Sequence, residues 1–175
     1  MKDYLLVIDM QKDFVDGSLG TPEAQLIVPA VVAKIKEFDG EVIITRDTHG
    51  ADYLQTQEGK YLPVEHCIEG TPGWELIPEI EAIRVEKDLR TYDKGVFGSV
   101  DLAADLLALY EQGEVASVTI IGLCTDICVA SNALILKSTM PELPIYIDPA
   151  CCAGVTPEKH AAALETMASC QIIIE

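Results

Sequence analysis

The chain has 175 residues, of which 49% are hydrophobic, and this length suits a single domain spanning 1–175 with one core. Its 12 Lys and Arg residues against 29 Asp and Glu residues give a formal net charge of −17. Such a charge repels phosphate backbones and anionic lipid headgroups. We therefore expect neither nucleic acid nor a membrane as a partner.

The pattern of apolar residues predicts strands and helices that alternate along the chain. In chain order these are a strand at 4–10, a helix at 21–38, a strand at 40–47, a short helix at 73–80, a strand at 89–94, a helix at 99–113, a strand at 115–123, a helix at 125–138 opened by Thr125 or Asp126, a strand at 144–150, a helix at 156–169 and a final strand in QIIIE. Alternation of this kind is typical of parallel pairing. The expected fold class is α/β: a three-layer sandwich in which a mostly parallel six-stranded, Rossmann-like sheet carries helices on both faces.

The N-terminus and the cysteines indicate a cytoplasmic location. YLLVID is too short for the core of a signal peptide, and no apolar run reaches the length of a membrane span. The six cysteines show no disulfide-rich spacing and no Cys-x-x-Cys pair. We expect them to be free thiols in a reducing cytosol.

Several reactive side chains follow the predicted strands. In a parallel sheet, ligands bind beyond the carboxyl ends of the strands. The first strand ends with Asp9, the second with Asp47 and then His49, the third near Lys94, and the fourth just before Cys124. A carboxylate, a lysine and a thiol are therefore expected at one edge of the sheet.

Cys128 falls in the first turn of a predicted helix. Backbone N–H groups and the helix dipole there favour a thiolate, and a carboxylate such as Asp9 could accept its proton. The N–H of Cys124, at the strand end, would complete an oxyanion site with that of Cys128. Each residue also has a plain structural explanation: Cys128 as core, Asp9 as a turn cap and Lys94 as a solvated loop residue. Spacing alone does not separate Lys94 from Lys87.

A second group of residues has the composition of a metal site. Two histidines with carboxylates suit Zn²⁺, Mn²⁺ or Fe²⁺, although histidines that only hydrogen-bond loops would give the same pattern. The donors are Asp47, His49, His66, Asp52 and Glu58. The third histidine, His160, is assigned to a surface or packing position.

The order of these motifs resembles the isochorismatase-like cysteine hydrolase superfamily, and most closely its nicotinamidase-like members. The matching segments are LLVIDMQKDFVDGSL, VIITRDTH, LPVEHCIEGTPGWEL, YDKGVFGSVDL and VTIIGLCTDICVASNA. They reach from residue 4 to about residue 133, and PIYIDPACCAG with TPEKHAAALETM extends the likeness over nearly the whole chain.

The resemblance implies a role for each member of an Asp–Lys–Cys triad. Asp9 would be the base, Cys128 the nucleophile and Lys94, which precedes GVFGS, the lysine, with Lys87 still possible. The N–H groups of Cys124 and Cys128 would form the oxyanion hole, with a cis peptide bond before Cys124.

The resemblance also implies a divalent metal, zinc first, with manganese or iron as alternatives. The metal ligands would be Asp47, His49, His66 and a fourth residue. This chain has no histidine between 49 and 66, so Glu58 is the predicted fourth ligand and Asp52 the alternative. Phe14 and Trp74 are predicted to contact the substrate ring.

The predicted function is a cysteine-dependent amidohydrolase that converts nicotinamide to nicotinate and ammonia through a thioester. Another small amide or carbamoyl substrate is the first alternative. Isochorismatases cleave a vinyl ether without a cysteine nucleophile, so Cys128 argues against that activity. A thiol redox or metal sensor, using Cys124, Cys128 and the Cys151–Cys152 pair, and a catalytically silent binding protein remain other classes. Family members are often dimers or tetramers, so we expect a homo-oligomer.

Overall fold

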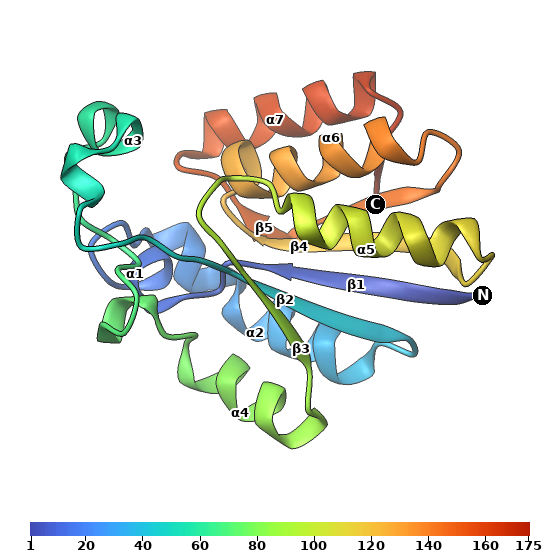
Figure 1. The fold of residues 1–175 in the computed structure, drawn as a ribbon, viewed down its shortest axis with the longest axis horizontal. Helices are drawn as coiled ribbons and strands as arrows, with labels where there is room; N and C mark the ends of the chain where they lie inside the picture. The colour runs from blue at the N-terminus through green and yellow to red at the C-terminus, as the bar shows by residue number, and fades with distance from the viewer.

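Six strands form one parallel sheet in the computed structural model, which describes residues 1–175 (Figure 1). The strands are β1 (Lys2–Ile8), β2 (Glu41–Asp47), β3 (Arg90–Lys94), β4 (Val115–Leu123), β5 (Ile145–Ala153) and β6 (Ile173–Ile174). Their order in the sheet is β3-β2-β1-β4-β5-β6, and every neighbouring pair is parallel. The predicted α/β class is confirmed, with a sheet that is parallel throughout.

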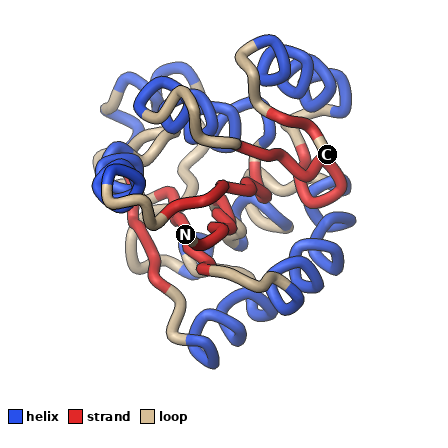
Figure 2. Tube along the Cα trace, turned by 90° about the vertical axis from the view of Figure 1, so that its right-hand side faces the viewer, coloured by secondary structure: helices blue, strands red, loops and turns tan.

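Helices cover both faces of the sheet, which Figure 2 shows edge-on between them. The helices and helical turns are α1 (Lys12–Val15), α2 (Pro22–Glu37), η1 (Tyr53–Gln55), α3 (Gln57–Tyr61), η2 (Pro72–Trp74), α4 (Pro78–Lys87), α5 (Val100–Glu111), η3 (Thr125–Val129), α6 (Ala130–Thr139) and α7 (Pro157–Ser169). Figure 1 shows α2 and α4 on one face and α5, α6 and α7 on the other. None of the helices is both long enough and apolar enough to span a membrane.

Two predicted helices differ from those observed. The segment at 73–80 is not one helix: a 3-10 turn ends at Trp74, and α4 begins only at Pro78 and continues to Lys87. Proline fixes φ and lacks an N–H, so it suits the first position of a helix and not its interior. The segment at 125–138 begins with the π-helical turn η3, and neither Thr125 nor Asp126 caps it with a side chain.

The strand order places a crevice beyond the carboxyl ends of β1 and β4. The chain lays down β1, β2 and β3 in one direction and then returns to β4, which pairs with β1. Ligands bind at such a switch point in open α/β sheets. Gly122 near the end of β4 has φ +115, and a Cβ there would collide with the backbone of Ile8 in β1. Glycine therefore permits the close approach of the two strands just where the crevice opens.

Candidate active site

Asp9, Lys94 and Cys128 meet beyond the carboxyl ends of β1, β3 and β4. The Lys94 Nζ atom lies 2.6 Å from Asp9 Oδ2 and 3.6 Å from Cys128 Sγ. All three residues are buried, and Asp9 is fully so. The lysine thus connects the carboxylate to the thiol in a site that excludes bulk water.

Each of the three side chains is held by its element. Asp9 follows β1 with φ +49, and its Oδ1 accepts a hydrogen bond of 2.7 Å from the hydroxyl of Thr45 in β2. Lys94 is the last residue of β3 and pairs in register with Asp47. Lys87, the alternative lysine, lies in α4, where its ammonium donates to the carbonyl of Ile35 at 3.5 Å. Of the two lysines, therefore, Lys94 lies beside Asp9 and Cys128.

Burial controls the ionisation of this cluster. It raises the pKa of Cys128 well above that of an ordinary thiol; the charge of Asp9 acts in the same direction, and Lys94 opposes both. Burial likewise raises the pKa of Asp9, against the opposing charge of Lys94. Burial acts to lower the pKa of Lys94, but the combined attraction of Asp9, Cys128 and Asp47 outweighs it, so this pKa is raised.

These directions correct one prediction from the sequence. The start of a helix and a nearby lysine were expected to give Cys128 a lowered pKa. The fully buried thiol beside the Asp9 carboxylate has a raised pKa instead, because desolvation penalises the thiolate more than the cationic neighbour favours it. The resting thiol therefore keeps its proton, and a base in the site must remove it.

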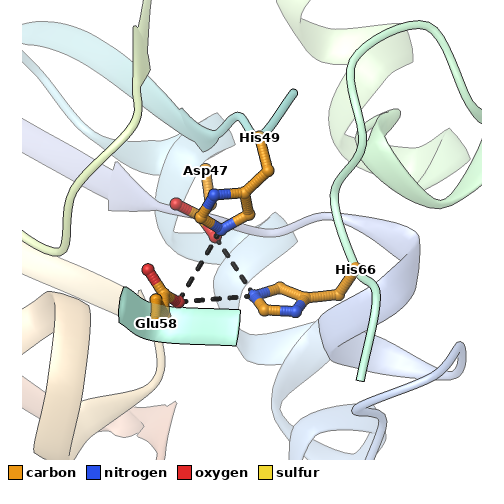
Figure 3. Close-up of side chains that lie close together, drawn as sticks. All are labelled: Asp47, His49, Glu58 and His66. Carbon is orange, nitrogen blue, oxygen red and sulfur yellow. Dashed lines mark ion pairs between the residues drawn. The ribbon is translucent and has the colours of Figure 1, made fainter. Parts of the chain in front are cut away.

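Four metal-type donors converge next to this cluster (Figure 3). Their ligand atoms all lie within 4.8 Å of one another. Nε2 of His49 is 2.9 Å from Asp47 Oδ2 and 3.7 Å from Glu58 Oε1. Nε2 of His66 is 3.5 Å from that Asp47 oxygen and 3.8 Å from the Glu58 oxygen. Glu58, in α3, occupies the fourth position that the sequence predicted for it, and Asp52 is not a member of the group.

The donors are arranged as a divalent cation requires. Nε2 of His49 is buried without a hydrogen-bond partner. Nδ1 of His66 is 2.8 Å from the carbonyl of Val64, which directs its Nε2 toward the other donors. Burial acts to raise the pKa of Asp47, but the nearby imidazoles of His49 and His66 and the charge of Lys94 together lower it, so its carboxylate is charged. Two imidazoles and two carboxylates fit Zn²⁺, Mn²⁺ or Fe²⁺.

Two polar residues of the IDMQKDF segment, which the sequence reasoning did not assign, hold the metal-type donors. The side chain of Gln11 accepts from the N–H of Asp47 at 2.7 Å and donates to its carbonyl at 2.8 Å. Asp13 Oδ2 accepts from the N–H of Cys67, next to His66, at 2.8 Å. Both residues lie in the segment LLVIDMQKDFVDGSL, which carries part of the family resemblance, and that was the sequence signal for them.

Members of the Asp–Lys–Cys cluster and of the metal-type donors line one cavity of about 330 Å³. Its wall is mostly apolar and includes Phe14, Leu62, Phe97 and Ile127, with Asp47, Glu58, His66 and Cys128 among the polar residues. Trp74 does not line it: the indole N–H donates to Thr48 at 2.8 Å, and the Arg46 guanidinium lies 3.9 Å from the ring centroid. This corrects the prediction that Trp74 contacts the substrate ring, because Arg46 already covers the indole face.

The backbone on the Cys128 side has the expected form. The peptide bond between Leu123 and Cys124 is cis, which confirms that expectation. The N–H of Cys124 has no acceptor among the hydrogen bonds of the turns and loops. A free N–H thus lies four residues before the buried thiol.

The fold and site define a class: an α/β protein with a buried Asp–Lys–Cys cluster beside a candidate divalent-metal centre. The chain belongs to the isochorismatase domain family, which it matches over residues 3–175.

Similar proteins with known activities are nicotinamidases and pyrazinamidases. The nicotinamidase/pyrazinamidase of Mycobacterium tuberculosis is 27% identical over 96% of this chain and 95% of its own length. The crystal structure of the Bacillus subtilis nicotinamidase/pyrazinamidase superposes with a TM-score of 0.83 at 27% identity, covering 99% of each chain. The crystal structure of the Pyrococcus horikoshii pyrazinamidase in complex with zinc superposes with a TM-score of 0.79 at 29% identity, covering 100% of this chain and 99% of that chain.

Proposed function

We propose that the protein is a nicotinamidase-like amidohydrolase that converts nicotinamide to nicotinate and ammonia through a thioester on Cys128. The observation that carries the proposal is the Lys94 ammonium placed between Asp9 and Cys128, where the thiol lines one cavity together with the metal-type donors Asp47, Glu58 and His66. Family membership and the nicotinamidase relatives support it.

The first half of the reaction forms the thioester. Asp9, whose raised pKa makes it a stronger base than an ordinary carboxylate, accepts the Cys128 proton as Sγ attacks the carboxamide carbon. The N–H groups of Cys124 and Cys128 hold the developing oxyanion, and Lys94 balances the negative charge. The C–N bond then breaks, and Asp9 gives its proton to the leaving nitrogen, which departs as ammonia.

The second half releases the acid. A water molecule gives a proton to Asp9 and attacks the thioester carbonyl. The C–S bond breaks, nicotinate leaves, and Cys128 recovers its proton from Asp9. Asp47, His49, Glu58 and His66 would hold a divalent cation, which we propose to be zinc, and such a cation would supply a Lewis-acid contact for the ring nitrogen.

The direct test is product formation by the purified protein loaded with Zn²⁺, Mn²⁺ or Fe²⁺ in separate samples. Ammonia and nicotinate should appear in equal amounts from nicotinamide, measured by a coupled ammonia assay and by chromatography. Absence of both products with every metal would refute the nicotinamide assignment.

The size of the cavity favours a substrate range wider than nicotinamide. A cavity of about 150 Å³ is enough to hold benzene, whereas this one has about 330 Å³. Pyrazinamide and other small ring carboxamides should therefore be hydrolysed as well. Parallel assays on such amides and on carbamoyl compounds, compared by kcat/KM, identify the preferred substrate.

Metal affinity provides a separate prediction. Glu58→Gln should weaken zinc binding by at least about tenfold, because it replaces a charged ligand with a neutral one. Asp52→Asn is the matched control and should bind zinc like the wild type, since Asp52 lies outside the donor group. Competition with a chelating dye measures both affinities. If Asp52→Asn bound zinc more weakly than the wild type and Glu58→Gln kept the wild-type zinc affinity, the fourth ligand would be Asp52.

A further inference from the structure

Helix α7 contacts the segment that carries Cys128. Nδ1 of His160 lies 2.8 Å from the hydroxyl oxygen of Thr125, the first residue of η3. Thr125 is fully buried, and His160 is half-buried. A second bond joins η3 to the loop that precedes α7, because the N–H of Val155 donates to Asp126 Oδ1 at 2.9 Å. His160, assigned to a surface or packing position from the sequence, thus bonds directly to the turn that bears the thiol.

The turn that begins at Thr125 depends on its neighbours for its position. The residue before it, Cys124, caps η3 without any side-chain hydrogen bond. Beyond Cys128 the chain is fixed by the buried side chain of Asn132, which donates to the Cys128 carbonyl at 2.7 Å and accepts from the N–H of Ser99 at 3.0 Å. On the other side of Cys128, next to Cys124, the hydrogen bond between His160 and Thr125 holds the start of the turn in the same way.

The start of α7, which carries His160, packs closely against the end of β5. A Cβ at Gly154 would come within 2.8 Å of the His160 backbone nitrogen, so glycine lets the start of α7 pack tightly against the end of β5. Burial lowers the pKa of His160, with Asp126 opposing, and this favours the neutral ring. A neutral imidazole can either accept from or donate to the threonine hydroxyl.

From this geometry we infer that His160 is a positioning residue for the cysteine site, acting through Thr125 on the backbone between Cys124 and Cys128. Its bond fixes the direction of the two N–H groups that receive the carbonyl oxygen. His160 itself does not line the cavity. The inference rests on the proposed function and adds to it a residue outside the Asp–Lys–Cys cluster.

The test compares variants that keep or remove the bond. Thr125→Val and His160→Phe remove it at similar side-chain size, whereas His160→Asn retains a polar atom near the position of Nδ1. With zinc-loaded protein and nicotinamide, kcat should fall at least about tenfold in the first two, because misdirected oxyanion donors cost rate. KM should change less than about twofold, and His160→Asn should recover most of the rate. Glu165→Gln, exposed on the same helix, is the control.

The double variant Thr125→Val/His160→Phe should be no slower than the slower single variant, because both changes remove the same bond. Thermal midpoints, measured in parallel, separate positioning from loss of fold. Equal kcat in wild type and His160→Phe, or a rate that follows the midpoint alone with no recovery in His160→Asn, would overturn the inference.

A second measurement does not depend on the substrate. In a Cys170→Ser background, alkylation of Cys128 by iodoacetamide is followed by mass spectrometry. Alkylation requires Asp9 to remove the thiol proton, and this transfer depends on the position of the turn that bears Cys128. Thr125→Val and His160→Phe should therefore react several-fold more slowly than wild type and His160→Asn. Unchanged alkylation would overturn the inference even if nicotinamide proves not to be the substrate, whereas failure of the proposed function shows as an inactive wild type.

Discussion

Replacing Cys128 with alanine should reduce ammonia release from nicotinamide by at least about a thousandfold, because alanine offers no nucleophile for the thioester. The fold should be retained, since the change removes a single sulfur atom from a site already closed by its neighbours. Cys170→Ala is the matched control: that cysteine is exposed at the end of α7 and should be dispensable.

The thioester itself can be intercepted. With hydroxylamine present, the wild type should give the hydroxamate of nicotinic acid in place of part of the nicotinate, and Cys128→Ala should give none. Near-normal ammonia release by Cys128→Ala would show that water attacks the amide directly. The buried thiol would then be a core residue.

Removing the lysine should affect both rate and stability. Lys94→Met leaves Asp9 fully buried without its 2.6 Å ion-pair partner, and an uncompensated buried charge costs about 3–5 kcal/mol. Asp9 would respond by taking up a proton, and a protonated Asp9 is no base for Cys128. We therefore expect a loss of activity of at least about a hundredfold together with a lower denaturation midpoint.

A double variant separates these two effects. Asp9→Asn/Lys94→Met removes both charges, so it should regain much of the stability lost in Lys94→Met while remaining inactive. Recovery should be partial, because Asp47 also lies 3.7 Å from the lysine Nζ. Urea unfolding of the single and double variants measures the coupling. Activity retained in the double variant would exclude Asp9 and Lys94 from the proton transfers.

The local signals in the sequence predicted most of the elements. Continuous apolar runs predicted β1 and β4, and the helices predicted to begin at residues 99 and 156 are capped by the side chains of Ser99 and Thr156. The short elements α1, η1 and α3 were not predicted, because segments of three to five residues are too short to show a helical periodicity. Glu58 was nevertheless predicted as the fourth metal-type donor, because the family resemblance implied a fourth ligand and this chain has no histidine between His49 and His66.

The sequence by itself determined the parallel α/β architecture, because apolar runs alternating with capped helices admit few other arrangements. It also determined which strand ends bear Asp9, Asp47 and Lys94.

The tertiary structure alone decided three matters, each of which depends on distance or solvent. It placed Lys94, and not Lys87, between Asp9 and the thiol. It reversed the expected pKa shift of Cys128, because a sequence does not reveal how completely a side chain loses its water. It brought His160 to Thr125 from 35 residues away, a contact that only the packing of α7 against η3 creates.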